Sequence, residues 1–324
     1  MRFAFNVVLT LVIWAALVTA PYWVSFVGGY VSLASRVVIY GLAAMSLNFL
    51  LGFTGVLSFG HAAYFGLGAY GAGLTILYFW PSSWAGIAAG IILGTIAAMI
   101  IGGLIIRLRG VYFAMVTIAF GQVFYFIAFR WHDVTGGDDG LSGWKRQPLE
   151  FGPLKIDILS DQTAFYYFTL VCFAIATGIM AILLRSPFGR TLIAIRENER
   201  RARFLGIPVE QHIWLSFVIS CLFTSLAGAL FALLNNFADP RMLRWDLSGT
   251  FVIIAVLGGM RSFWGPLVGA VIYVWLQDYL SSLPPWHGWN LNENWMSFIG
   301  LFFMLIVLFF PRGILGLVRR RSLA

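Results

Sequence analysis

The stretch GFTGVLSFGHAAYFGLGAYGAG, residues 52–73, combines seven glycines with small and aromatic side chains and has no charged residue. It lies within a longer segment, between Arg36 and Arg107, that contains no Asp, Glu, Lys or Arg. A helix needs about 20 residues to cross a hydrocarbon core roughly 30 Å thick. The segment therefore predicts about three membrane-spanning helices whose small residues allow close packing.

The whole chain has the composition of a membrane protein. Hydrophobic residues make up 60% of its 324 positions and charged residues only 10%. We expect an all-α polytopic membrane protein with one transmembrane domain over residues 1–324, about 8–10 transmembrane helices, Gly-rich broken segments and an internal repeat. The apolar runs lie near residues 3–20, 31–50, 62–80, 85–106, 110–129, 163–184, 211–236, 247–260, 263–283 and 295–310.

Two of these runs have an alternative interpretation. Residues 1–20 have the general pattern of a secretory signal, but Pro21 follows directly and disfavours cleavage, so we interpret them as the first span. The run 247–260 is short, and a re-entrant segment would give the same pattern as a short span.

The distribution of arginines predicts the orientation. With the N-terminus inside, most basic residues, including the cluster from Arg185 to Arg203, fall on one side of the membrane. The positive-inside rule makes this side cytoplasmic and places both termini there. It also accounts for the net charge of +8, so the lipid bilayer is the expected environment and no nucleic acid is expected as a partner.

Two Gly-rich breaks predict the walls of a translocation path. The first runs from Gly52 to His61, and the second, VLGGMRSFWGPLVGA at residues 256–270, repeats its Ser-Phe pair. Irregular backbone at membrane depth is tolerated only against protein or a wet cavity. A lone histidine such as His61 is more often hydrogen-bonded packing than a ligand. The predicted path residues are Thr54, Ser58, Phe59, His61, Gln122, Gly258 and Gly259.

Residues 186–208, SPFGRTLIAIRENERRARFLGIP, form the only long, strongly charged helical pattern. Ser186 and Pro187 predict its start, and Gly206 with Pro208 its end. The residues alone leave two interpretations open: an interfacial helix on anionic headgroups, or a docking helix for a cytoplasmic partner. The longest polar loop, residues 130–161, is predicted to be external, either as a solvated turn cluster or as a partner contact.

Several functional classes find no support in the sequence. No GxxxxGK[ST] motif occurs, so ATP hydrolysis would need another subunit. The four histidines and two cysteines have no metal-ligand spacing, and no nucleophile and base form a pattern, so we predict no metal site, no catalytic site and no enzyme activity. Carboxylates inside the predicted spans are scarce, which disfavours an ion-coupled secondary carrier or channel but leaves it as the alternative.

Five segments together resemble the LivM-type permease of branched-chain amino acid ABC transporters, over residues 38–317. They are NFLLGFTGVLSFGHAAYFGLGAYGAG at 48–73, TIAFGQ at 117–122, GGDDGLSG at 136–143, IRENERRARFLGI at 195–207 and FPRGILG at 310–316. The resemblance implies a permease subunit of an ATP-driven importer in the bacterial inner membrane that translocates branched-chain amino acids or a related small polar solute.

The resemblance also implies partners. These are a second homologous permease subunit, two ATP-binding cassette subunits and a periplasmic substrate-binding protein. ATP and Mg would be bound by the partner subunits, with no cofactor in this chain. The segment 186–208 becomes the cytoplasmic coupling helix, and the residues expected to dock the ATPase subunit are Arg196, Glu197, Asn198, Glu199, Ala202, Gly206 and Ile207.

Overall fold

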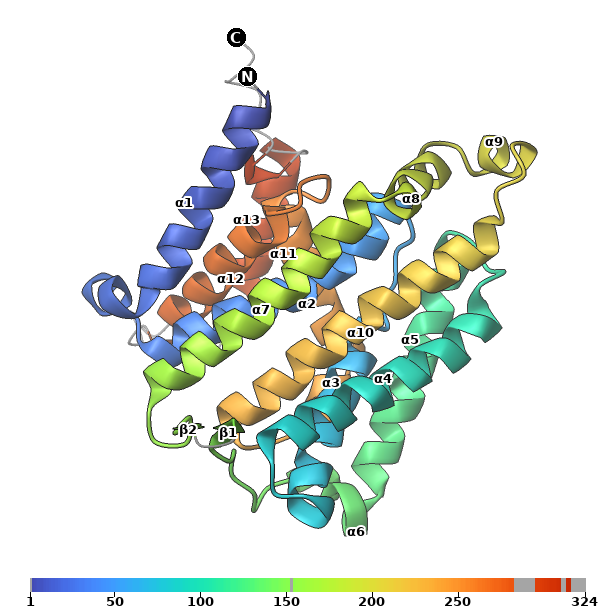
Figure 1. Ribbon diagram of the computed structural model, residues 1–324. Helices are drawn as coiled ribbons and strands as arrows, with labels where there is room; N and C mark the ends of the chain where they lie inside the picture. Colours follow the sequence, from blue (N-terminus) through green and yellow to red (C-terminus); the bar gives the residue numbers. More distant parts are fainter. Residues whose placement is uncertain (1, 152–153, 283–294, 310–312, 316–324) are drawn as a thin grey trace.

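The computed structural model describes residues 2–151, 154–282, 295–309 and 313–315. Its helices follow the predicted apolar runs closely (Figure 1). The longer ones are α1 (Arg2–Trp23), α2 (Val31–Thr54), α3 (His61–Leu74), α4 (Ser83–Ile105), α5 (Val111–Arg130), α7 (Gln162–Arg185), α10 (Val209–Asn235), α11 (Trp245–Gly258), α12 (Gly265–Ser282) and α13 (Trp295–Phe309).

The shorter elements connect these helices. They are η1 (Val24–Val27), η2 (Thr75–Phe79), α6 (His132–Thr135), η3 (Gly137–Asp139), the antiparallel strands β1 (Leu149–Phe151) and β2 (Leu154–Ile156), α8 (Pro187–Glu197), α9 (Glu199–Phe204) and η4 (Pro240–Leu243). The small hairpin was not predicted from the sequence. It does not alter the fold class, which is confirmed as an all-α polytopic membrane protein.

Seven helices in the described part of the chain are long and apolar enough to cross a membrane: α1, α2, α3 with η2, α4, α5, α7 and α10. Of these, α2 and α10 are central, since 83% and 78% of their spanning windows are buried, against 17% for α1. The centre of the bundle is thus α2, α3 and α10, and α1 lies at its edge (Figure 1).

The short predicted run 247–260 corresponds to α11. Its 14 residues extend roughly 21 Å, less than the hydrocarbon thickness. The chain reaches α11 through the non-helical residues 236–239 and η4, whose Leu243 packs against Gly66 of α3. Irregular backbone is therefore placed inside the bundle, against protein, as its polar groups require.

Close backbone contact between α3 and α10 depends on glycine. A Cβ at Gly228 of α10 would overlap the Phe65 carbonyl oxygen, and one at Gly68 of α3 would overlap the carbonyl oxygen of Ser225. This packing matches the role predicted for the small residues of the opening segment.

The polar loop at residues 130–161 is folded onto one end of the bundle. Leu141 and Ala238 form an isolated antiparallel bridge, and the Arg146 backbone N–H donates to Oδ1 of Asn236 at 2.7 Å. The loop is thus fixed to the segment that follows α10. Its predicted external position remains an expectation.

The glycine contact between α3 and α10 leads to a first prediction. Gly228→Val should destabilise the folded chain by about 1–3 kcal/mol, because the new side chain must displace the α3 backbone. The measurement is the melting temperature of the purified chain in detergent, with Gly249→Ala in α11, where an added Cβ meets nothing within 4 Å, as control. An unchanged melting temperature for Gly228→Val would contradict this account of the packing.

Candidate functional site

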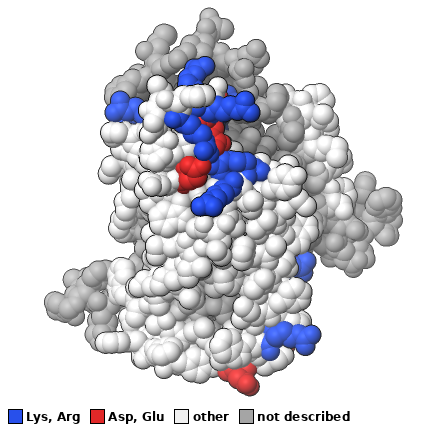
Figure 2. Space-filling view, turned by 90° about the vertical axis from the view of Figure 1, so that its right-hand side faces the viewer, with Lys and Arg blue, Asp and Glu red and all other residues white. Residues whose placement is uncertain are grey.

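Charged side chains gather at one end of the bundle. α8 and α9 lie there, opposite the end that carries α6, β1 and β2 (Figure 1). The space-filling view shows Lys and Arg clustered at the α8–α9 end, with acidic side chains among them (Figure 2). The predicted docking segment and the predicted external loop are therefore at opposite ends.

The predicted single helix over residues 186–208 is in fact two helices. Asn198 has an extended conformation between α8 and α9, and its side chain accepts a hydrogen bond from the Arg201 N–H at 2.9 Å. Asn198 thus caps α9, because an N-cap side chain satisfies an unpaired N–H of the first turn. Glu197 and Arg201, four residues apart, lie on opposite sides of this break, whereas Glu199 and Arg203 form an i,i+4 ion pair within α9, at 2.8 Å.

The predicted ends of the segment agree better with the structure. Pro187 occupies the first turn of α8, although the Ser186 hydroxyl donates back to the Leu183 carbonyl and does not cap. Gly206, with φ of 81°, turns the chain after α9, and Pro208 precedes α10. Glycine suits this left-handed position because it has no Cβ.

A small apolar core fixes the segment to the bundle. Ile195 of α8 and Ala202 of α9 are buried with Val209 and Ile213 of α10, and Ile207 packs partly buried against them. Val56 and Ile106, from the ends of two other spanning segments, complete this core. Ala202 and Ile207 therefore serve internal packing, which leaves little of them for a partner.

Ion pairs tie α9 to two neighbouring elements. Arg109, which follows α4, contacts Glu199 at 2.9 Å, and Arg203 contacts both Glu199 at 2.8 Å and Glu210 of α10 at 2.6 Å. Partial burial acts to raise the pKa of Glu199, but the hydrogen bonds from Arg203 and Arg109 outweigh it and the pKa is lowered. The carboxylate thus stays ionised, and the network stays intact, as pH falls to the usual range of a glutamate pKa.

Arg196 connects α8 to the first Gly-rich break. Its guanidinium donates to the Gly52 carbonyl oxygen near the end of α2. Its side chain lies where a Cβ at Gly55 would be, and Gly55 has φ of 82°. The predicted docking residue Arg196 is therefore an internal link between the charged segment and the predicted path.

Two exposed apolar residues at the end of α9 were missed by the sequence analysis. Phe204 is 91% exposed and Leu205 is 75% exposed, at the tip of the charged segment. The sequence could have predicted their exposure. They lie between the basic run and Gly206, and they fall outside the apolar helix face that includes Leu192 and Ile195. Among the predicted docking residues, Glu197, Asn198 and Gly206 share this exposure.

The predicted path residues Thr54, Ser58 and His61 are buried between α2, α3 and α10. The His61 ring lies 3.0 Å from the Ser58 hydroxyl through Nδ1 and 2.8 Å from the Ser220 hydroxyl through Nε2. The Ser220 hydroxyl itself donates to the Ser46 carbonyl, so it accepts from the histidine. The network thus assigns the hydrogen to Nε2 and leaves Nδ1 to accept from Ser58.

These groups belong to a longer row of buried polar side chains, which we call the polar seam. Thr54 pairs with Ser216 at 3.3 Å, and Ser46 pairs with Thr224 at 2.6 Å. The seam consists of Ser46, Thr54, Ser58, His61, Ser216, Ser220 and Thr224. Its α10 members recur every four residues, so they share one helix face, and this spacing could have been read from the sequence.

The other predicted path residues lie outside the seam. The Phe59 N–H donates to the Thr117 hydroxyl of α5 at 3.2 Å, and Gln122 is half-buried on α5, with its Nε2 lacking a hydrogen-bond partner within the described structure. Gly258 packs against the backbone of Gly265, and Gly259 has φ of 114°.

The second Gly-rich break nevertheless adjoins the first. The Asn48 side chain donates to the Ser262 carbonyl at 3.1 Å, and Gly52 packs against the Met260 carbonyl. The last turns of α2 thus contact both breaks. In the residues that the structure describes, no group of three His, Cys, Asp or Glu side chains is placed to hold a metal ion.

Comparisons with known proteins agree with the resemblance of the five segments. Residues 29–308 match the family model of the branched-chain amino acid transport system, permease component. The high-affinity branched-chain amino acid transport system permease protein LivM of Escherichia coli (strain K12) is 29% identical over 94% of this chain and 74% of that protein. The probable branched-chain amino acid transport permease protein LivM of Methanocaldococcus jannaschii is 24% identical, over 86% and 90%.

More distant similarity extends to other permeases. The autoinducer 2 import system permease protein LsrC of Escherichia coli O157:H7 is 27% identical over 50% of this chain and 46% of that protein. No solved structure matches.

The seam leads to a second prediction. Ser220→Ala should lower the stability of the folded chain by about 1–3 kcal/mol, because His61 Nε2 loses its partner in a buried site and the Ser46 carbonyl loses its bond from Ser220. The matched control is Ser225→Ala on the same helix, whose hydroxyl donates only to the Cys221 carbonyl one turn earlier. Thermal unfolding in detergent compares the two, and equal melting temperatures would refute a special role for the Ser220 contacts.

Proposed function

The chain belongs to the family of branched-chain amino acid transport system permease components, and from this premise we propose that it is the membrane path of an ATP-driven importer in the bacterial inner membrane. The observation that carries the proposal is the link from α8 and α9 to the two Gly-rich breaks through Arg196 and the end of α2. A force applied to the charged segment would reach the backbone beside the polar seam.

The tip of α9 is the proposed docking point for an ATP-binding cassette subunit. Phe204 and Leu205 are large apolar side chains exposed outside the spanning part of the bundle. Aromatic anchors that fill a partner's pocket dominate the binding energy of many interfaces. Glu197 and the exposed arginines of α9 lie in the same charged segment and present both signs of charge, which gives orientation and specificity.

The polar seam is the proposed route of the solute. Its hydroxyls and His61 can replace water around the ammonium and carboxylate groups of an amino acid. Tyr64 and Phe217 pack edge-to-face against the His61 ring, and Phe113 packs against Phe217, so an aromatic wall adjoins the hydroxyls. A polar row beside an apolar wall suits a small solute with one polar and one branched aliphatic end.

The seam is closed in this conformation, since its side chains are buried and bonded to one another. Transport therefore requires α2 and α10 to separate. We propose that ATP binding by the partner subunits moves α8 and α9, and that Arg196 transmits the motion to Gly52 and the break after α2. Alternating access of this kind needs no covalent chemistry in this chain.

The remaining partners follow from the family and the two ends of the bundle. A second homologous permease subunit and two ATP-binding cassette subunits, which bind ATP and Mg, would complete the complex. On the opposite side, a periplasmic substrate-binding protein would deliver solute to the folded loop at residues 130–161, where Asp138 and Asp139 are exposed. The start of α1 lies at the same end of the bundle as α8 and α9 (Figure 1), so we propose the cytoplasmic side for it as well.

Docking by the α9 tip gives a third prediction. Phe204→Ala should weaken assembly with the ATPase subunit roughly tenfold or more, because an anchoring aromatic side chain is lost. Co-purification of the tagged chain and its stimulated ATPase activity measure this. Phe26→Ala is the control, since Phe26 is 88% exposed at the other end of the bundle. Normal assembly of Phe204→Ala with the ATPase subunit would overturn docking by the α9 tip. Solute flux by the purified chain without any ATPase subunit would support an ion-coupled carrier and overturn the proposed function.

The mechanical role of Arg196 gives a fourth prediction. Arg196→Lys keeps the charge but should disturb the bond to the Gly52 carbonyl, so the complex should assemble and hydrolyse ATP while solute uptake per ATP falls several-fold. Uptake and hydrolysis are measured together in proteoliposomes. The control Arg200→Lys changes an exposed arginine of α9. An unchanged uptake-to-hydrolysis ratio in Arg196→Lys would show that this bond does not transmit the motion.

A further inference from the structure

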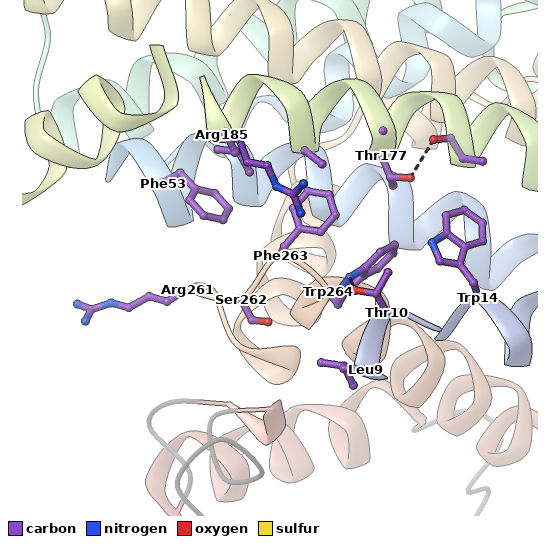
Figure 3. A pocket seen from close by; sticks show the side chains of 14 residues that line it. Leu9, Thr10, Trp14, Phe53, Thr177, Arg185, Arg261, Ser262, Phe263 and Trp264 are labelled. Atoms are coloured by element: carbon purple, nitrogen blue, oxygen red, sulfur yellow. Dashed lines mark hydrogen bonds between the residues drawn. The ribbon is translucent and has the colours of Figure 1, made fainter. Parts of the chain in front are cut away.

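α1 and α7 are joined at one end and separate towards the other. Near the end that carries η1, the Tyr166 hydroxyl donates to the Leu17 carbonyl at 2.6 Å and the Tyr167 hydroxyl donates to the Val18 carbonyl at 3.2 Å. Towards the α8–α9 end the two helices leave a cavity of about 460 Å³ between them, bounded by residues 261–264 (Figure 3).

The cavity has a wall built from interlocked aromatic side chains. The Trp14 ring packs edge-to-face on Trp264 and on Phe173, with centroids 5.9 and 6.0 Å apart. The Trp264 indole N–H donates to the Thr10 hydroxyl at 3.0 Å. These contacts fix the position of α1 at this level, so the cavity is a built feature and not a gap between loosely packed helices.

Two arginines lie at the rim of this cavity. Arg185 ends α7 and extends towards Phe263, and Arg261 stands on the other side and points outward (Figure 3). Within the described residues neither guanidinium has a carboxylate within 4.0 Å, and the cavity lining contains no Asp or Glu. The rim is therefore positively charged, with no counter-ion among the described residues.

The cavity opens between surfaces that face the bilayer. On α1, Leu11 and Val12 are exposed, and on α7, Ile175, Ile179 and Ile182 are exposed. In a membrane these side chains contact acyl chains. An occupant can thus enter sideways from the lipid, with an apolar body in the cavity and a polar end at the arginines.

We propose that this cavity binds one anionic phospholipid from the leaflet on the α8–α9 side. Its phosphate lies at the rim that carries Arg185 and Arg261, and an acyl chain lies along Trp14 and Gly178, where an added Cβ would meet nothing within 4 Å. Basic pockets between spanning helices on the cytoplasmic side have the charge and shape that anionic headgroups require. The inference does not depend on the solute or on ATPase docking.

Two variants separate the charge of the rim from the space in the cavity. Arg185→Gln with Arg261→Gln removes the rim charge, and Gly178→Phe fills the cavity while both arginines remain. The control for the first is Arg190→Gln with Arg200→Gln, on the same side and exposed. The control for the second is Ile179→Phe, at the lipid-facing neighbour of Gly178.

The full chain, purified from its native membrane, is placed in nanodiscs that contain phosphatidylcholine with a minor fraction of phosphatidylglycerol. Native mass spectrometry after release counts the lipids retained. We expect the unmodified chain to retain one phosphatidylglycerol. Retention of this lipid should fall roughly fivefold for each arginine removed in the charge variant, and in Gly178→Phe it should fall as far as in the complete charge variant. Neither control should change it.

Other outcomes would overturn the proposal. Retention that is equal for phosphatidylcholine and phosphatidylglycerol would mean that the arginines select no headgroup. Loss in the charge variant and its control alike would mean a diffuse surface attraction. Full retention in Gly178→Phe would mean that the lipid binds elsewhere.

Discussion

The close contact of the α3 and α10 backbones is the constraint on which the rest of the structure depends. Gly68 and Gly228 leave no room for a side chain at this crossing, so the two helices meet backbone to backbone. The contact brings the start of α3, with His61, against the face of α10 that carries Ser220. α2 then covers both helices, and its hydroxyl and carbonyl groups complete the hydrogen bonds of the seam.

In the charged segment, neighbouring residues face in opposite directions, some towards the bundle and some away from it. In α8 and α9, Arg196 and Glu199 turn towards the bundle, where their bonds hold the segment in place. Phe204 turns outward, although it is the more apolar residue. A segment that transmits motion from a partner needs both features: a rigid attachment to the helices that must move, and an exposed surface that the partner can bind.

The sequence predicted the positions of the long helices, because the boundary between water and lipid determines where each helix begins and ends. The ends of the long helices agree within a few residues, because a polar break marks each crossing. It did not predict the break at Asn198, since a capping residue inside a charged run has the same helical periodicity as its neighbours. Nor could it join Ser46, His61 and Ser220 into one network, because these contacts depend on how three helices cross. The predicted internal repeat and the roles of the path residues remain predictions.

The polar seam has an electrical consequence. Its seven members are six hydroxyl side chains and the His61 imidazole. The imidazole accepts on one nitrogen and donates on the other, so the seam carries no fixed charge. Moving an elementary charge across a membrane costs or releases about 2.3 kcal/mol per 100 mV. A zwitterion that passes such a seam moves no net charge through the field. Passage of such a solute along the proposed route would therefore involve no electrical work against the membrane voltage.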